Sequence, residues 1–373
     1  MNVKTIKEIK TLLDLGVSNV SEISRRVAAA QGVECTDSYR RTLSNYIKKM
    51  QEHPALAQET IDKGLDFSSI RTYWHKSKQF SIRSDVKESF NYDDFREDFC
   101  NMVEGLAPKH SKIVRDKIVD GHCLLIDPAD IHINKLTSVY ETGVEYNSQI
   151  AVMRVFQGVD ATLDKSRGYN LDKIILVVGN DVLNTDTIKG TTTKGTEQDT
   201  HLKWFDAFRM AKQMYVDIID KLLQVADVEI VYNVSNHDHM SGFFLADSLA
   251  SWYREHPNVV FNNSPSHRKY TTYGKNLIGT THGDGAKQTD LPLLMCHEAS
   301  EHWHECKHRY WFTHHVHHKT SRDMMSVQIE SLRSPSPADS WHHTKGYQHS
   351  PLCIEGFLFH KEFGQVARFT TIF

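Results

Sequence analysis

The chain has 373 residues, of which 39% are hydrophobic and 24% charged, a composition typical of a globular protein with a large core. No apolar run approaches the ~20 residues that a membrane helix needs, and no apolar stretch of a secretory signal follows residues 1–4. We therefore expect a cytoplasmic protein without a membrane partner. Its six cysteines are scattered without a CxxC spacing, which favours reduced thiols over a zinc site or disulfides.

The net charge of −3 conceals an asymmetry along the chain. Residues 1–50 hold nine Lys or Arg and five Asp or Glu, so the remaining residues carry a net charge of −7. An acidic body repels a polyanion unless metals or a basic segment compensate.

Residues 1–52 show the pattern of three short helices. Ile6 and Ile9 are spaced as on one helical face, and Gly16 ends this first helix. Asn19 is a cap for a second helix, and Thr36 begins a third. Three helices of this length predict a helix-turn-helix-like domain.

The third helix combines an apolar face with a basic one, and a basic final helix is typical of DNA binding. The alternative is a small bundle used for packing, regulation or homodimerisation, with a solvated basic face. The candidate nucleic-acid-binding residues are Arg40, Arg41, Lys48 and Lys49.

Residues 53–118 are interpreted as a linker or adapter region. Within it, residues 73–83 interleave aromatic and positively charged side chains. Such a run can stack on bases and follow a phosphate backbone, and an ordinary amphipathic strand explains it equally well.

From residue 119 the pattern alternates between strands and helices, which predicts an α/β domain over 119–373. Late strands with few helical signals predict a second sheet packed on the first. Loop 184–200 is long enough for us to expect mobility. The expected helices span about 146–165, 201–224 and 243–255, and the expected strands span 123–126, 173–178, 228–234, 258–261, two within 268–281, 308–313, 326–330, 353–360 and 365–372.

Five short polar segments each follow a predicted strand, where functional side chains of α/β sheets gather. A lone aspartate after a strand is usually a turn former or helix cap, and a lone histidine is usually a satisfied polar residue. Five such segments together are poorly explained as caps. Their candidate residues are Asp130 and His132, Asp181, the run Asn236, His237 and Asp238, His282, and the pair His315 and His317.

This order of motifs, D-x-H, G-x-D, N-H-D, H and H-x-H, resembles the calcineurin-like metallophosphoesterase superfamily, including its double-strand-break repair nuclease branch. The resemblance covers about residues 120–320 and implies a β-sandwich of two mixed sheets flanked by helices. It also implies two divalent metal ions, for which we favour Mn²⁺, with Fe²⁺, Zn²⁺ and Mg²⁺ left open.

Residue by residue, the resemblance implies two ligand sets that share Asp181. It places His237 and Asp238 in the catalytic motif, with His237 orienting or protonating the departing oxygen. The first metal would take Asp130, His132, Asp181 and His317, and the second Asp181, Asn236, His282 and His315.

The chain departs from the family pattern at three places. Asn180 separates the glycine of the second motif from Asp181, and Ser235 and His314 stand where the family has glycine. A register with His314 in place of His315 as the ligand therefore stays open. Before Pro128, we interpret Asp127 as a turn former rather than as a hydrogen-bond acceptor behind the ligands.

A basic helical segment ahead of such a site favours a DNA nuclease or phosphodiesterase. The pairing of these two modules suggests a bacterial virus or mobile element as the source. One alternative is a phosphatase or nucleotide phosphodiesterase with a dimerisation or regulatory module. Another is a DNA-binding scaffold whose phosphoesterase domain is catalytically dead. Residues 333–337 and 341–343 are further candidates for a wall of the substrate site.

Overall fold

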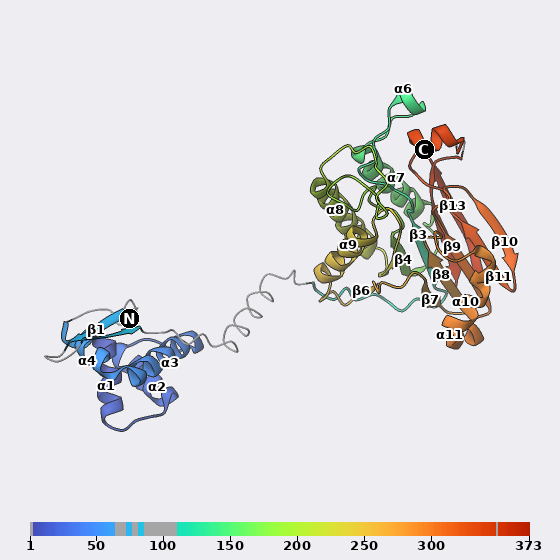
Figure 1. Cartoon of the computed structure of the whole chain (residues 1–373). Coiled ribbons are helices and arrows are strands. Elements are labelled where there is room, and N and C mark those ends of the chain that lie inside the picture. The colour runs from blue at the N-terminus through green and yellow to red at the C-terminus, as the bar shows by residue number, and fades with distance from the viewer. Residues whose placement is uncertain (1–2, 64–71, 77–80, 86–109, 348–349) are drawn as a thin grey trace. The chain divides into compact units, whose positions relative to one another are not determined.

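The structure is a computed structural model that describes residues 3–63, 72–76, 81–85, 110–347 and 350–373. The chain divides into two compact units, Met1–Gly105 and Leu106–Phe373, each of which is described by itself (Figure 1). In the described part of the chain, every helix is too short or too polar to cross a bilayer.

The described residues of the first unit form four helices: α1 (Val3–Asp14), α2 (Val20–Gln31), α3 (Asp37–Glu52) and α4 (Pro54–Lys63). The predicted caps are confirmed, because Asn19 accepts the N–H of Glu22 and Thr36 accepts the N–H of Tyr39. The helices bury one apolar cluster that includes Ile6, Ile9, Ile23, Val27, Leu43, Ile47, Met50, Leu56 and Ala57.

This helical unit extends beyond residue 52, because Leu56 and Ala57 of α4 belong to its core. A two-stranded antiparallel hairpin, β1 (Thr72–Lys76) and β2 (Ser81–Asp85), also belongs to it. The interleaved run at 73–83 thus forms strands, and its residues 77–80 lie outside the described part.

One of the two sheets of the second unit is mixed and has six strands in the order β13-β12-β3-β4-β5-β6. The last four of these strands are parallel, whereas β12 runs antiparallel to both β3 and β13. Their bounds are β3 (His122–Asp127), β4 (Leu171–Gly179), β5 (Asp227–Asn233), β6 (Val259–Asn262), β12 (Cys353–His360) and β13 (Gly364–Ile372).

A five-stranded mixed sheet has the order β10-β11-β9-β8-β7. Here β8, β9 and β11 are parallel, and β7 and β10 are antiparallel edge strands. The bounds are β7 (Lys269–Tyr273), β8 (Asn276–Thr281), β9 (His308–Thr313), β10 (Thr320–Met324) and β11 (Val327–Ser331).

The two sheets pack face to face, and the period of two along each strand divides its side chains between cores. Cys123 and Leu125 of β3 join Phe312 of β9 in the core between the sheets. Leu124 and Ile126 point the other way, into the core beneath the helices. Because β3 is buried on both faces, its sequence is a continuous apolar run.

Helices cover the outer faces of both sheets. Figure 1 shows α7, α8 and α9 together on one side of the strands. Trp311, Leu291 and Met295 belong to a separate core of the five-stranded sheet and α10. The remaining elements are α6 (Val139–Thr142), α7 (Ser148–Lys165), α8 (Trp204–Leu223), α9 (His239–Trp252), the 3₁₀ turn η2 (Gln288–Asp290), α10 (Leu291–Glu298), α11 (Ser300–Glu305) and α12 (Ser340–Lys345).

The expected sandwich of two mixed sheets with flanking helices is confirmed. The sequence patterns did not reveal β10, α10, α11 or α12. These elements are short, and β10 is half-exposed, so their apolar periodicity is weak.

Candidate metal centre

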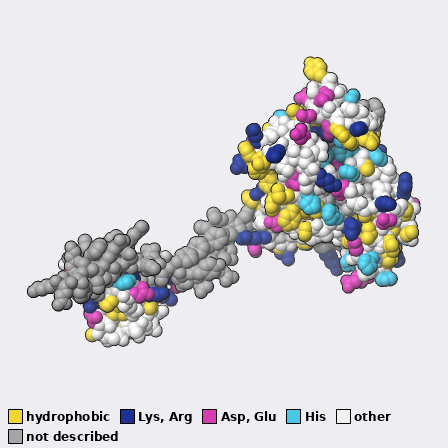
Figure 2. All heavy atoms as spheres, viewed as in Figure 1, with side chains coloured by type: hydrophobic (Ala, Val, Ile, Leu, Met, Phe, Trp, Pro, Cys, Tyr) yellow, Lys and Arg dark blue, Asp and Glu magenta, His cyan; other side chains and the backbone are white. Residues whose placement is uncertain are grey.

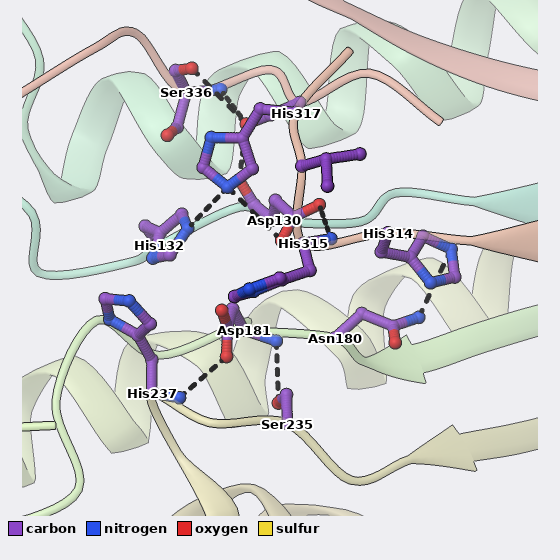
Figure 3. Close-up of polar contacts among 12 residues, drawn as sticks. Asp130, His132, Asn180, Asp181, Ser235, His237, His314, His315, His317 and Ser336 are labelled. Atoms are coloured by element: carbon purple, nitrogen blue, oxygen red, sulfur yellow. Dashed lines mark hydrogen bonds and ion pairs between the residues drawn. The ribbon is translucent and has the colours of Figure 1, made fainter. Parts of the chain in front are cut away.

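The predicted ligands lie in loops that follow the carboxyl ends of strands in both sheets. The loops after β3, β4 and β5 leave the six-stranded sheet at one edge, because these strands are parallel. The loops after β8 and β9 leave the facing sheet in the same way. Figure 3 shows Asp130, His132, Asp181, His237, His315 and His317 directed toward a common space.

Five of the seven predicted ligands have a left-handed backbone. This conformation costs about 1–3 kcal/mol for each residue, and residues that adopt it cluster at functional sites. The preceding Gly179 is also left-handed, and a Cβ there would lie 2.2 Å from the carbonyl oxygen of Asn233. The φ angles are 52° for Asp130, 50° for His132, 58° for Asp181, 71° for His315 and 54° for His317.

Backbone hydrogen bonds hold two of these strained loops side by side. Asp130 N donates to Asn180 O at 2.8 Å, and His132 N donates to Asp181 O at 2.9 Å. The next rung, from Ile133 N to Val182 O, measures 2.7 Å. The loops after β3 and β4 therefore present their side chains as one rigid unit.

The first ligand group is formed by Asp130, His132 and His317, whose candidate ligand atoms all lie within 4.8 Å of one another. The Nε2 atoms of His132 and His317 are 3.3 Å apart. Asp130 Oδ1 lies 3.4 Å from His317 Nε2. These three residues match the first predicted set, apart from the shared Asp181.

The second ligand group is formed by Asp181, His282 and His315, again within 4.8 Å. His282 Nε2 lies 3.2 Å from Asp181 Oδ2 and 2.9 Å from Asn236 Oδ1. All four members of the second predicted set therefore converge.

Asp181 connects the two groups. Its carboxylate also lies within 4.8 Å of ring nitrogens of His132 and His237, which form a third group with it. Asp181 thus belongs to both groups, the position that a bridging residue would take. His237 is therefore also a candidate ligand, in addition to its predicted catalytic role.

The charge states of Asp181, His132 and His315 suit metal binding. Burial favours the neutral acid, but His282 and His237 outweigh it and hold the pKa of Asp181 well below its usual value. Burial and then His237 lower the pKa of His132, and burial and then His282 lower the pKa of His315. Ionised carboxylates and neutral imidazoles are the forms that bind cations. Burial lowers the pKa of His282, but Asp181 outweighs burial and raises it to about 9, so a cation must displace a proton from this imidazole.

Buried polar atoms support this fit to a metal. Asp130 Oδ1, which lies on the side of His317 Nε2, is buried without a hydrogen-bond partner. Two imidazole Nε2 atoms face each other at His132 and His317, an arrangement that a shared cation stabilises. Imidazole and carboxylate donors suit Mn²⁺, Fe²⁺ or Zn²⁺.

His237 lies at the open side of the group, half-buried. Its Nδ1 is 3.0 Å from the carbonyl oxygen of Asn184, so Nδ1 carries the proton and Nε2 remains for another partner. Its backbone N–H donates to Asp181 Oδ1 at 2.8 Å.

Asp238 does not reach the ligand groups, contrary to its predicted catalytic role. It is fully buried, and its two carboxylate oxygens accept hydrogen bonds from Leu183 N at 2.9 Å and from the hydroxyl of Ser235. Burial, and then Asp181, raise the pKa of Asp238 to about 7. Its contacts instead tie the loop after β5 to the loop after β4.

The structure favours His315 over His314 as the ligand. His314 is buried and directed away from the ligand groups, with Nδ1 3.0 Å from Thr281 O and Nε2 2.9 Å from Asp127 Oδ2 (Figure 3). The interpretation of Asp127 as a turn former is therefore wrong. A buried hydrogen-bonded pair was hidden in sequence because its members are 187 positions apart.

Further supporting residues escaped the sequence patterns. Ser334 donates its hydroxyl to Asp130 O at 2.7 Å. The buried Lys135 donates to Pro337 O at 2.8 Å and pairs with Asp339 at 3.2 Å. Lone serine and lysine residues carry no local signal, although a lysine buried within a polar loop is unusual.

Loop 184–200 is irregular but attached to its surroundings. Asp186 accepts the backbone N–H groups of Met240 and Ser241 at the start of α9. An apolar cavity of about 340 Å³ lies beside the loop, lined by Ile188, Trp204 and Phe244 among others, and no predicted ligand lines it.

The candidate nucleic-acid residues lie on α3 in the first unit. Arg40, Arg41 and Lys48 are exposed, and Lys49 is half-buried. Arg40 pairs with Asp37 at 3.2 Å. The basic face is thus present on the surface of that unit.

No family model and no curated protein sequence matches the chain. Among solved structures, zinc-bound Vps29 from Entamoeba histolytica is similar at 11% identity and a TM-score of 0.27, over 67% of this chain and 98% of that one. An archaeal phosphodiesterase has 8% identity and a TM-score of 0.31, over 68% and 99%. A predicted phosphoesterase from Streptococcus pneumoniae has 10% identity and a TM-score of 0.27, over 69% and 100%. Similarity at this level does not identify an activity for this chain.

Proposed function

We propose that this protein is a two-metal phosphoesterase that hydrolyses phosphodiester bonds, with DNA as its favoured substrate. The position of Asp181 supports this proposal most directly. Its carboxylate has an oxygen within 4.8 Å of a ring nitrogen of His132 in one group, and within 4.8 Å of ring nitrogens of His282 and His315 in another. Two cations held by one bridging carboxylate form the arrangement used for in-line displacement at phosphorus.

The chemistry divides between the bound metals and the chain's own residues. A pair of divalent cations, when bound, supplies positive charge that stabilises the attacking and departing oxygens. Asp130 and Asp181 offset the repulsion between those cations. The imidazoles of His132, His282, His315 and His317 complete the ligand sets, and Asn236 adds an amide oxygen beside His282.

His237 is the proposed proton donor. Asn184 O fixes its tautomer and ring orientation, which leaves Nε2 on the side of His132 and Asp181. In the imidazolium form both ring nitrogens carry a proton, and the proton on Nε2 can pass to the departing oxygen when the phosphoester bond breaks, which leaves the tautomer with its proton on Nδ1.

The charge distribution supports DNA as the substrate. Figure 2 shows side chains of both charges and several histidines on the described face of the second unit, which carries a net charge of −3. The exposed basic face of α3 supplies the complementary attraction to a phosphate backbone.

The test is Mn²⁺-dependent hydrolysis of a substrate panel: labelled DNA, nucleotides, p-nitrophenyl phosphate and its bis ester. We expect the phosphodiesters to be cleaved by wild type and by the surface control Asp160→Asn, and Asp181→Asn to lose activity on all of them. DNA cleavage that survives in Asp181→Asn would exclude this site. Hydrolysis confined to monoesters would instead identify a phosphatase.

His237→Ala separates a proton donor from a ligand. If His237 donates a proton, the variant keeps the metal content of wild type and loses activity, most strongly on esters with poor leaving groups. Loss of a metal ion in His237→Ala, measured by metal analysis of purified protein, would assign His237 to a ligand set.

A further inference from the structure

A row of rings leads from the candidate metal centre to the surface. The ring of His342 on α12 stacks on that of His317, with centroids 5.4 Å apart and planes 18° apart. Trp341 meets His342 edge to face at 5.0 Å, and Tyr347 lies 5.8 Å from Trp341. The row therefore begins at a proposed ligand and ends in two large aromatic side chains.

Buried contacts fix the position of this row relative to the ligands. Asp339 caps α12 by accepting the N–H of His342 at 2.9 Å, and it contacts His342 Nδ1 at 2.6 Å. Lys135, which follows His132 by three positions in the chain, forms an ion pair with Asp339. Ser334 anchors the same segment to Asp130 O. The loop that carries the ligands thus also positions α12.

The outer rings of the row are open to solvent. Trp341 is 57% exposed and Tyr347 is 64% exposed. Large exposed aromatic side chains beside an anion-binding site are typical of surfaces that stack on bases. Each base stacked on an aromatic ring contributes about 1–3 kcal/mol, whichever base it is.

We propose that Trp341 and Tyr347 bind a nucleobase of the substrate while the neighbouring phosphate lies at the metal centre. This inference rests on the proposed phosphoesterase function and narrows it to nucleotides and nucleic acids. A base inside a duplex has no free face, so the site selects single strands or unpaired ends.

The test measures binding of full-length protein in EDTA by fluorescence anisotropy. One labelled probe is a thymidine tetramer, and the other is a tetramer of abasic sites with the same phosphates. We expect Trp341→Ala to weaken binding of the thymidine tetramer by roughly 5- to 100-fold and to leave the abasic probe unchanged. Trp341→Phe retains a ring and should retain most of the affinity.

Trp204→Ala is the matched control, because Trp204 is 52% exposed and lines the separate apolar cavity. Loss of thymidine binding in Trp204→Ala, with none in Trp341→Ala, would overturn the proposal and place the base in that cavity. Equal weakening of both probes by Trp341→Ala would also overturn it. A labelled thymidine mononucleotide then distinguishes a nucleotide substrate from a nucleic acid. If Trp341→Ala weakens binding of the mononucleotide as strongly as binding of the tetramer, the substrate is a nucleotide.

Kinetics with Mn²⁺ separate this inference from the function on which it rests. Without hydrolysis of any probe by wild type, the phosphoesterase proposal fails, and the EDTA measurement still decides the stacking. If both tetramers are hydrolysed with the same KM, and Trp341→Ala changes neither KM, the stacking proposal fails and the phosphoesterase proposal stands.

Discussion

Ser235 accepts a hydrogen bond from the backbone N–H of Asp181, with 2.8 Å between Asp181 N and Ser235 Oγ. The same hydroxyl donates to the buried carboxylate of Asp238. Ser235 thus links the proposed bridging ligand to the loop after β5.

Ser235→Ala should therefore lower the free energy of unfolding by about 1–3 kcal/mol, because it leaves a buried N–H and a buried carboxylate oxygen without partners. It should also weaken Mn²⁺ binding. Urea denaturation and metal titration measure the two effects. Ser248→Ala is the control, since its half-buried hydroxyl donates only to Leu245 O within α9; equal effects of both substitutions would contradict the assignment.

The buried pair of Asp127 and His314 predicts a larger loss. Both side chains are fully buried, so Asp127→Ala leaves an imidazole without its acceptor and should cost about 3–5 kcal/mol in unfolding free energy. Asp127→Asn keeps an acceptor oxygen and should cost less. Asp120→Ala is the control. It removes the partner of His360 in a pair whose carboxylate is 73% exposed, so the unfolding free energy should change little. A mild effect of Asp127→Ala would show that the pair contributes little.

Metal binding should stabilise the fold. A cation that binds only the native state, at a concentration 100 times its Kd, adds about 2.7 kcal/mol for each site. Mn²⁺ should raise the melting temperature of wild type and of His318→Ala, whose ring contacts only Val316 O in the same loop. The rise should be reduced in His317→Ala and nearly absent in Asp181→Ala. The idea of a shared ligand fails if Asp181→Ala keeps the full rise.

Lys269 gives a pH dependence whose sign is defined. Burial lowers its pKa from 10.5 to about 8, so the unfolded chain binds this proton more tightly than the folded protein does. The lysine therefore destabilises the fold below pH 8, and this penalty disappears as the pH rises from 8 to 10.5. Lys269→Met should raise the unfolding free energy by on the order of 2 kcal/mol at pH 7 and much less at pH 10. A difference that stays constant between these pH values would contradict the shifted pKa.

The basic face of α3 predicts a salt-dependent contribution to DNA binding. Combined Arg40→Gln, Arg41→Gln and Lys48→Gln should weaken binding and reduce the slope of log K against log salt by about 2–3. The control, with Lys4, Lys7 and Arg25 changed to Gln, removes the same charge from exposed positions of α1 and α2. Equal slopes for the two variants would show a general charge effect and not a DNA-binding face.

Local patterns were sufficient to predict the order of the main strands along the chain and the polar residues that follow them. The apolar runs of β3, β4 and β5 end at polar residues, and the alternation of strands with helices places those ends at one edge. The caps at Asn19 and Thr36 were equally visible, because a cap depends on residues three positions apart.

Long-range contacts were beyond the sequence. Whether Asp127 formed a turn or a buried pair depended on His314, and whether Asp238 faced the metals depended on Ser235 and Leu183 N. The sequence by itself determined which residue types stand at the ends of which strands, because strand signals are local. Only the tertiary structure decided which atoms face the shared space, because left-handed backbone at Asp130 and Asp181 and the packing of two sheets direct those side chains.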